Sequence, residues 1–100
     1  MIYTAVIEPE TDGQYSVHLP AMRGVHSCGK TRQEALERIV EAAELWIDVE
    51  RKYGREVPAN DPIAILVDVN RVIADQRSDG LDPQLELVSV AVPIIIREAA

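Results

Sequence analysis

The feature that most limits the fold of this chain is one long amphipathic segment with a helix signal at each end. Thr31 and Glu34 have the spacing of a capping box, in which the hydroxyl and the carboxylate satisfy free amides at a helix start. Gly54 suits the left-handed position that follows a helix end. Apolar residues recur between them every three or four positions, which predicts one buried stripe. The stripe consists of Leu36, Ile39, Val40, Ala43, Trp46, Ile47 and Tyr53.

This stripe needs an apolar surface to pack on, and the preceding residues predict one. Residues 2–7 are rich in β-formers, and residues 15–19 alternate between apolar and polar side chains. The Asp12-Gly13 pair between them predicts a hairpin turn, because it readily adopts positive φ. Gly24 permits another tight turn before a third strand at residues 25–28. We therefore expect three antiparallel strands covered by the helix.

The rest of the chain has a weaker pattern. Residues 62–77 alternate partly like a strand, whereas Asp61-Pro62 is typical of a helix cap followed by a favoured first-turn proline. We predict a helix of about four turns, with a strand as the alternative. A loop then leads to a β-rich run from Leu85 to Val92, which Pro93 ends or confines to a sheet edge.

The chain of 100 residues has the size of a single α+β domain, in which an antiparallel sheet is packed by one long helix. Residues 1–57 are the expected β-β-β-α core, residues 58–84 the uncertain helix and loop, and residues 85–96 a C-terminal strand used in oligomerisation. One face of that strand is apolar with little chain left to cover it, and such strands mark interfaces. The expected interface of a dimer or larger assembly is Val88, Val90, Val92 and Ile94.

The charge of the chain limits its partners. The 10 Lys and Arg residues oppose 17 Asp and Glu residues, giving a net charge of −7, which argues against direct nucleic-acid binding and favours a basic partner. A single cysteine, Cys28, allows no intrachain disulfide. The start of the chain lacks a signal-peptide pattern, and no apolar run reaches the roughly 18 residues that span a bilayer. We expect a cytoplasmic protein that does not enter membranes.

Acidic residues on the predicted helix form a line that we call the acidic ridge. The ridge consists of Glu34, Glu37, Glu41, Glu44 and Asp48. These residues lie roughly 140° around the helix from the apolar stripe. One interpretation is a solvated face, since Arg38 and Lys52 partly neutralise it at i,i+4. The other is a partner-binding surface formed by Glu37, Glu41, Glu44 and Asp48, because a basic partner would relieve the repulsion among the acids.

Few residues in the chain are suited to catalysis or metal binding. His26 and Cys28 share a face of the third strand, and a zinc site with His18 is conceivable. These side chains are scattered over two strands, however, which is more typical of surface histidines and a small buried thiol. A triad of Cys28, His26 and Asp12 lacks any sign of a base and its orienting group. Glu8 is almost the only acid in the predicted strands, so we expect no catalytic residue, metal or cofactor.

Residues 2–50 contain a series of short motifs in a characteristic order. They are Tyr3-Thr4-Ala5-Val6-Ile7-Glu8, Asp12-Gly13, Tyr15-Ser16-Val17, Pro20, Gly24, Gly29, Thr31 and Glu34-Ala35-Leu36. With these motifs, residues 2–50 resemble the N-terminal part of the HicB antitoxin family. The resemblance implies a partly degenerate ribonuclease-H-like or double-stranded-RNA-binding-domain-like fold. It also implies a non-enzymatic protein that binds and masks HicA, a small basic toxin that cleaves messenger RNA.

Members of the HicB family commonly carry a C-terminal DNA-binding segment, and this chain departs from them there. Only residues 94–100 follow Pro93, which is too short for a helix-turn-helix. We therefore expect no operator binding by this chain alone. The alternative to an antitoxin is an orphan HicB-like structural or regulatory protein that self-associates and has no toxin partner; an enzyme with residual nuclease activity is a more remote one.

Overall fold

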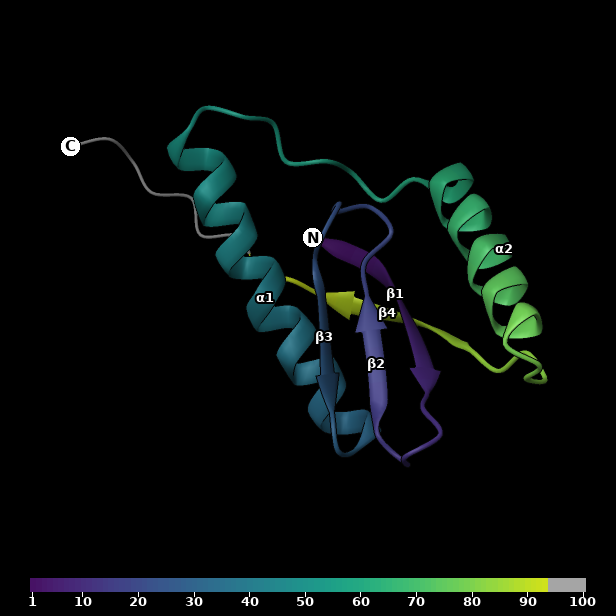
Figure 1. Ribbon diagram of the computed structural model, residues 1–100. Coiled ribbons are helices and arrows are strands. Elements are labelled where there is room, and N and C mark those ends of the chain that lie inside the picture. The colour runs from purple at the N-terminus through teal and green to yellow at the C-terminus, as the bar shows by residue number, and fades with distance from the viewer. Residues whose placement is uncertain (94–100) are drawn as a thin grey trace.

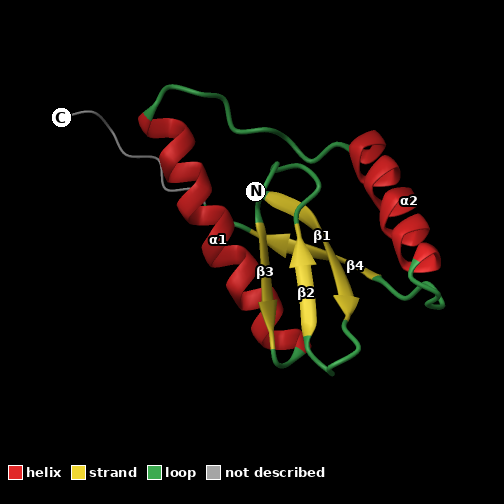
Figure 2. Ribbon diagram, viewed as in Figure 1, coloured by secondary structure: helices red, strands yellow, loops and turns green. Residues whose placement is uncertain are grey.

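The computed structural model describes residues 1–93 of the chain. Its elements are β1 (Ile2–Pro9), β2 (Tyr15–His18), β3 (His26–Gly29), α1 (Arg32–Lys52), α2 (Pro62–Ser78) and β4 (Glu86–Ala91). Figures 1 and 2 show a four-stranded sheet with the two helices on opposite sides of it. The expected α+β fold, with an antiparallel sheet packed by one long helix, is confirmed.

The strands are ordered β3-β2-β1-β4, and every neighbouring pair is antiparallel. The central strand β1 therefore pairs with both its hairpin partner and the C-terminal strand. Its alternate residues Tyr3, Ala5 and Ile7 are buried in the core shared with α1. Val6 points to the other face and is also fully buried, together with Val72 of α2. The sheet thus has an apolar layer on each face, although the layer under α1 is much larger.

Helix α1 begins and ends at the predicted signals. The Thr31 hydroxyl accepts a hydrogen bond from the Glu34 amide at 3.1 Å. The Glu34 carboxylate completes the cap by accepting from the Lys30 amide at 3.3 Å, one residue earlier than the standard capping box. Gly54 has a φ of 71° and donates to the carbonyl of Arg51 at 3.1 Å, which ends the helix.

The apolar stripe of α1 packs on the sheet as expected, except at its C-terminal end. Ile39, Ala43 and Ile47 are buried, and Leu36, Val40 and Trp46 pack partly buried against the same core. Tyr53 is 64% exposed, so its place in the stripe was predicted wrongly. It lies at the helix cap, where Lys52 and Arg55 sit over its ring. A residue at this position has already left the helical repeat that directs the others to the sheet.

The segment with two interpretations is a helix. The Asp61 side chain accepts a hydrogen bond from the amide of Ile63 at 3.0 Å, and Pro62 occupies the first turn. Residue Val72 is buried, while Ile63 and Leu66 are largely exposed. Helix α2 is therefore attached to the sheet by a narrow strip of its surface.

Candidate partner-binding site

The acidic ridge lies beside an apolar groove between α1 and β4. Helix α1 packs mainly over β3 and β2 and has few contacts with β4, so an opening remains on that side. The opening, which we call the α1–β4 groove, has a volume of about 420 Å³. It is lined by Leu36, Glu37, Val40, Glu41, Val90 and Ala91. Two residues of the ridge therefore adjoin apolar surface that a partner can cover.

The acids of the ridge differ in their partners. Glu34 forms an ion pair with Arg38 at 3.1 Å. Glu37 accepts a hydrogen bond from the side-chain amide of Gln33 at 3.0 Å. Within residues 1–93, none of Glu37, Glu41 and Glu44 forms an ion pair. Among the described residues, no basic side chain pairs with these three acids, so solvent and salt screen much of their mutual repulsion. The fourth predicted residue, Asp48, is exposed one turn farther along α1.

The valines predicted as an oligomer interface face the interior of the domain. Val90 is 7% exposed and Val92 is 1% exposed, because pairing of β4 with β1 turns them toward α1. Val88 is partly buried against the same core, and Ile94 lies outside the described residues. Oligomerisation through β4 stays a prediction. Within residues 1–93, the surface that β4 offers is an unpaired backbone edge and the half-exposed Leu87 on its other face.

A bidentate ion pair fixes the start of β4 to the start of α1. Arg32 donates two hydrogen bonds to the carboxylate of Glu86, at 2.8 and 2.6 Å. These hydrogen bonds hold the pKa of Glu86 below its ordinary value and raise the pKa of Arg32. The ion pair therefore fixes α1 and β4, which border the groove, relative to each other at this end.

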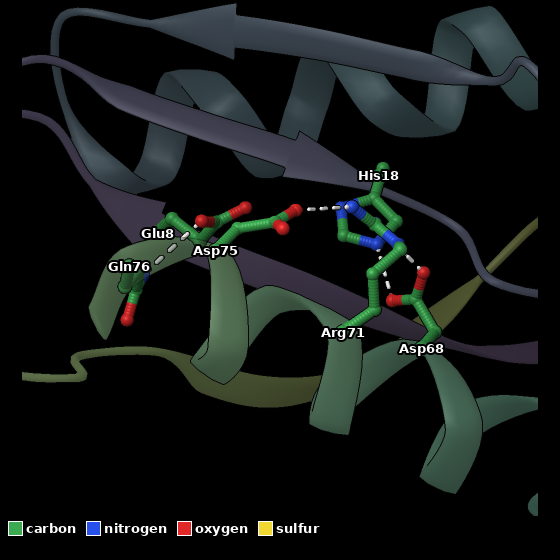
Figure 3. Close-up of polar contacts among 6 residues, drawn as sticks. All are labelled: Glu8, His18, Asp68, Arg71, Asp75 and Gln76. Atoms are coloured by element: carbon green, nitrogen blue, oxygen red, sulfur yellow. Dashed lines mark hydrogen bonds and ion pairs between the residues drawn. The ribbon is translucent and has the colours of Figure 1, made fainter. Parts of the chain in front are cut away.

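A second, polar cleft of about 630 Å³ lies on the opposite face of the sheet, between β2, β3 and α2. Figure 3 shows His18 pointing from β2 toward Asp68 of α2. Its Nε2 atom lies 2.5 Å from a carboxylate oxygen of Asp68. Arg71 donates to Asp68 and to Asp75, both at 3.0 Å, and hydrogen bonding to Asp68 is the main cause of its raised pKa. This network attaches α2 to the sheet.

The contact between His18 and Asp68 was not predicted from the sequence. The two residues are fifty positions apart in the chain, and their meeting depends on α2 crossing the second face of the sheet. A usable signal was present, however. Asp68 and Gln76 lie four positions before and after Val72, on the helix face that a buried valine would direct to the sheet.

The structure does not assemble the catalytic or metal-binding groups considered from the sequence. His18 pairs directly opposite His26, and both share with Cys28 the face turned away from α1. His18 Nε2 instead contacts Asp68, and His26 Nδ1 contacts the carbonyl of Gly24 at 3.0 Å. Asp12 accepts from the Gln14 amide in the hairpin turn, beyond the far end of β2. Cys28 is exposed, not buried as expected, because it lies on the outward face of an edge strand.

Two further kinds of feature are absent from residues 1–93. No group of three or more His, Cys, Asp or Glu side chains among these residues is arranged to hold a metal ion. Neither helix of this part of the chain combines the length and the hydropathy that crossing a membrane requires.

The family model described as HicB-like antitoxin of bacterial toxin–antitoxin systems matches residues 3–93. The chain belongs to this family. Two relatives are UPF0150 proteins. The protein from Synechocystis sp. is 41% identical over 69 residues, which is 65% of this chain and 87% of the relative. The protein from Thermoplasma acidophilum is 37% identical over 67 residues, which is 67% of this chain and 97% of the relative.

Solved structures of antitoxin and toxin–antitoxin proteins share the fold. The N-terminal domain of the Burkholderia pseudomallei antitoxin HicB superposes with a TM-score of 0.66 at 21% identity, covering 94% of this chain and all of that domain. A chain of a toxin–antitoxin complex from Streptococcus pneumoniae gives a TM-score of 0.60 at 22% identity, covering all of this chain and 80% of that one. The resemblance drawn from residues 2–50 is confirmed and extends over α2 and β4.

Proposed function

We propose that this chain is a non-catalytic antitoxin that binds a small basic HicA-type toxin and masks its active site. Membership of the HicB-like antitoxin family supports this role. Solved complexes of HicA with HicB proteins, among them a HicA3–HicB3 complex, have chains of the same fold. The net charge of −7 supports a basic partner.

The observation that carries the proposal is the position of Glu37 and Glu41 on the rim of the α1–β4 groove. Acids at the rim attract a basic partner and orient it during encounter. The apolar side chains beneath them, such as Leu36 and Val40, then supply the surface whose burial holds the partner in place. If the acidic ridge were only a solvated helix face, no apolar groove would be expected beside it.

The test uses the product of the reading frame next to this gene, purified as a complex and separated. We expect a variant carrying Glu37→Gln, Glu41→Gln and Glu44→Gln to associate with that toxin roughly tenfold more slowly at low salt. Its association rate is also expected to depend less on salt. The measurement is stopped-flow association at low and moderate salt, after circular dichroism has confirmed folding.

A matched control separates the ridge from net charge. A variant with Glu56→Gln, Asp79→Asn and Asp82→Asn removes the same number of charges from exposed positions that belong neither to α1 nor to the lining of the groove. It is expected to associate at nearly the rate of the natural chain. Equal rates for the two triple variants would contradict the ridge as the docking surface and would direct attention to Glu8, Glu10 and Asp12 of the hairpin.

The alternative function is an orphan HicB-like protein that self-associates through β4. The open edge of this strand is the observation that favours it. Sedimentation equilibrium at micromolar concentration distinguishes the two. A stable dimer that no neighbouring gene product dissociates or joins would support the orphan function.

A further inference from the structure

We infer that the outer edge of β4 receives an extended, basic segment of the partner, which is added as a further strand to the four-stranded sheet. The inference rests on the proposed function for the class of partner, a basic toxin. It adds the mode of binding and the residues that direct it.

The hydrogen-bond register leaves alternate backbone groups of β4 pointing outward. Met1 and Val92 exchange two hydrogen bonds, at 2.9 and 2.8 Å. In an antiparallel pair such bonded residues alternate with unbonded ones, so the groups of every second residue face β1. The N–H and C=O groups of Leu87, Ser89 and Ala91 therefore point away from the sheet. Within residues 1–93 no strand pairs with them.

The two edges of the sheet differ in how well they are protected. The edge strand β3 has four residues, and the carbonyl of Cys28 within it accepts from the guanidinium of Arg38 at 3.3 Å. Strand β4 has six residues and contains neither proline nor lysine, the residues that commonly prevent edge pairing. The edge at β4 is thus the one that is open to a further strand.

The groove above this edge determines which side chains fit. On the side of α1, a strand beside β4 meets the apolar surface of Leu36, Val40 and Val90. Glu37 and Glu41 stand on the rim above it. A Lys or Arg at this position can lay its methylene stem along the apolar surface and place its charge beside the two carboxylates. The fitting segment is therefore an extended one with Lys or Arg on its α1-facing side.

Charge also argues against a second copy of this chain as the occupant. Strand β4 contains one acid, Glu86, and no base. Antiparallel pairing of two copies about Ser89 would satisfy the outward backbone groups, but each β4 would bring only Glu86, which is already paired with Arg32 of its own copy, and no free base to the other groove. The acids on the rim would remain uncompensated, so a basic strand of another protein fits better.

The probes are two capped peptides with the six-residue length of β4. One alternates Val with Lys, and the other alternates Val with Glu. We expect the Val/Lys peptide to bind the full chain and to protect the amides of Leu87, Ser89 and Ala91 from hydrogen exchange. The Val/Glu peptide is expected not to bind. Binding is measured by titration with the isotope-labelled chain, and exchange by nuclear magnetic resonance.

The variant Ser89→Pro tests the edge directly. Proline has no N–H, so the variant loses an outward hydrogen-bond donor, and the proline ring obstructs an added strand. The N–H of Ser89 that is lost makes no hydrogen bond to β1, so the pairing of β4 with β1 is retained. Affinity for the Val/Lys peptide is expected to fall roughly tenfold or more, whereas Ser89→Ala, which keeps the donor, is expected to bind like the natural chain. If Ser89→Pro fails to fold, the protection of the three amides in the natural chain decides the question.

Several results would overturn the inference. The first three are equal binding of the two peptides, undiminished binding of the Val/Lys peptide by folded Ser89→Pro, and edge amides that the peptide leaves unprotected. The fourth is a dimer of the natural chain that Ser89→Pro dissociates but that the Val/Lys peptide does not dissociate. A toxin that binds the natural chain and Ser89→Pro equally would refute strand addition and leave the antitoxin function standing. Edge amides protected by the Val/Lys peptide, with no toxin bound, would refute the antitoxin function and support the basic strand site.

Discussion

At Gly29 the backbone of β3 lies close against the first turn of α1. A Cβ atom at this position would lie 2.5 Å from the amide nitrogen of Ala35 and 2.9 Å from the carbonyl carbon of Glu34. Both atoms belong to the backbone, so the first turn of α1 would have to move. Gly29→Ala is expected to lower the free energy of unfolding by about 1–3 kcal/mol.

Chemical denaturation measures this loss, and Cys28→Ala is the control. Cys28 is adjacent but exposed, so truncating it is expected to change the free energy of unfolding by less than about 0.5 kcal/mol. A Gly29→Ala variant as stable as this control would show that β3 and α1 do not pack as closely as described.

Tyr3 gives the chain a specific dependence on alkaline pH. Its hydroxyl donates to the carbonyl of Pro58 at 2.6 Å, and burial raises the pKa of the phenol above 10.0. Because the folded chain favours the neutral phenol, this contribution to stability is complete below pH 10 and is lost as pH rises through the folded pKa. Tyr3→Phe is expected to cost about 1 kcal/mol at neutral pH and to reduce the decline in alkali.

The measurement is denaturant unfolding across the alkaline range, with Tyr53→Phe as the matched control. Tyr53 is 64% exposed, so its replacement is expected to leave both the stability and its pH dependence nearly unchanged. An alkaline decline of the same size in Tyr3→Phe and in the natural chain would contradict the assignment to Tyr3.

At the scale of elements, α2 is expected to open more readily than α1. Helix α1 buries four residues in the core, whereas Val72 is the buried residue of α2. Hydrogen exchange is therefore expected to be faster in the middle of α2 than in the middle of α1. Val72→Ala is expected to increase exchange in α2 further while leaving α1 nearly unchanged. Equal protection of both helices in the natural chain would show that they unfold as one unit.

Local sequence signals predicted the helices and strands better than they predicted the tertiary contacts of those elements. Thr31, Gly54 and Asp61 act through hydrogen bonds within a few residues, so the sequence located α1 and favoured a helix over a strand for residues 62–77. The burial of the β4 valines depends on which strand β4 joins. The exposure of Cys28 likewise depends on which face of the sheet its side chain occupies. The contact of His18 with Asp68 depends on α2 crossing that face. Such relations are not encoded in any single stretch of sequence.

The same distinction applies to the candidate site. Helical periodicity predicted that Glu37 and Glu41 share a line on α1. It did not reveal that Val90 and Ala91 would form the other wall of a groove beside them. That juxtaposition follows from the offset of α1 toward β3, which only the packed structure shows.

At the scale of the whole molecule, the acidic surface is expected to exclude nucleic acids. The net charge is −7, and binding to phosphates depends on basic residues that release counterions. We expect no submicromolar, salt-sensitive binding of this chain alone to the DNA upstream of its gene. An electrophoretic mobility shift assay with the purified chain provides the measurement, and a shift at submicromolar concentration would contradict the expectation.

The central claim, that this chain neutralises a basic toxin by masking it, is tested most directly by RNA cleavage. The product of the neighbouring reading frame is mixed with messenger RNA and increasing amounts of the folded chain. We expect cleavage to stop near equimolar antitoxin, and the Glu37, Glu41 and Glu44 triple Gln variant to require more protein than the Glu56, Asp79 and Asp82 control. Undiminished cleavage in the presence of excess folded chain would contradict the account.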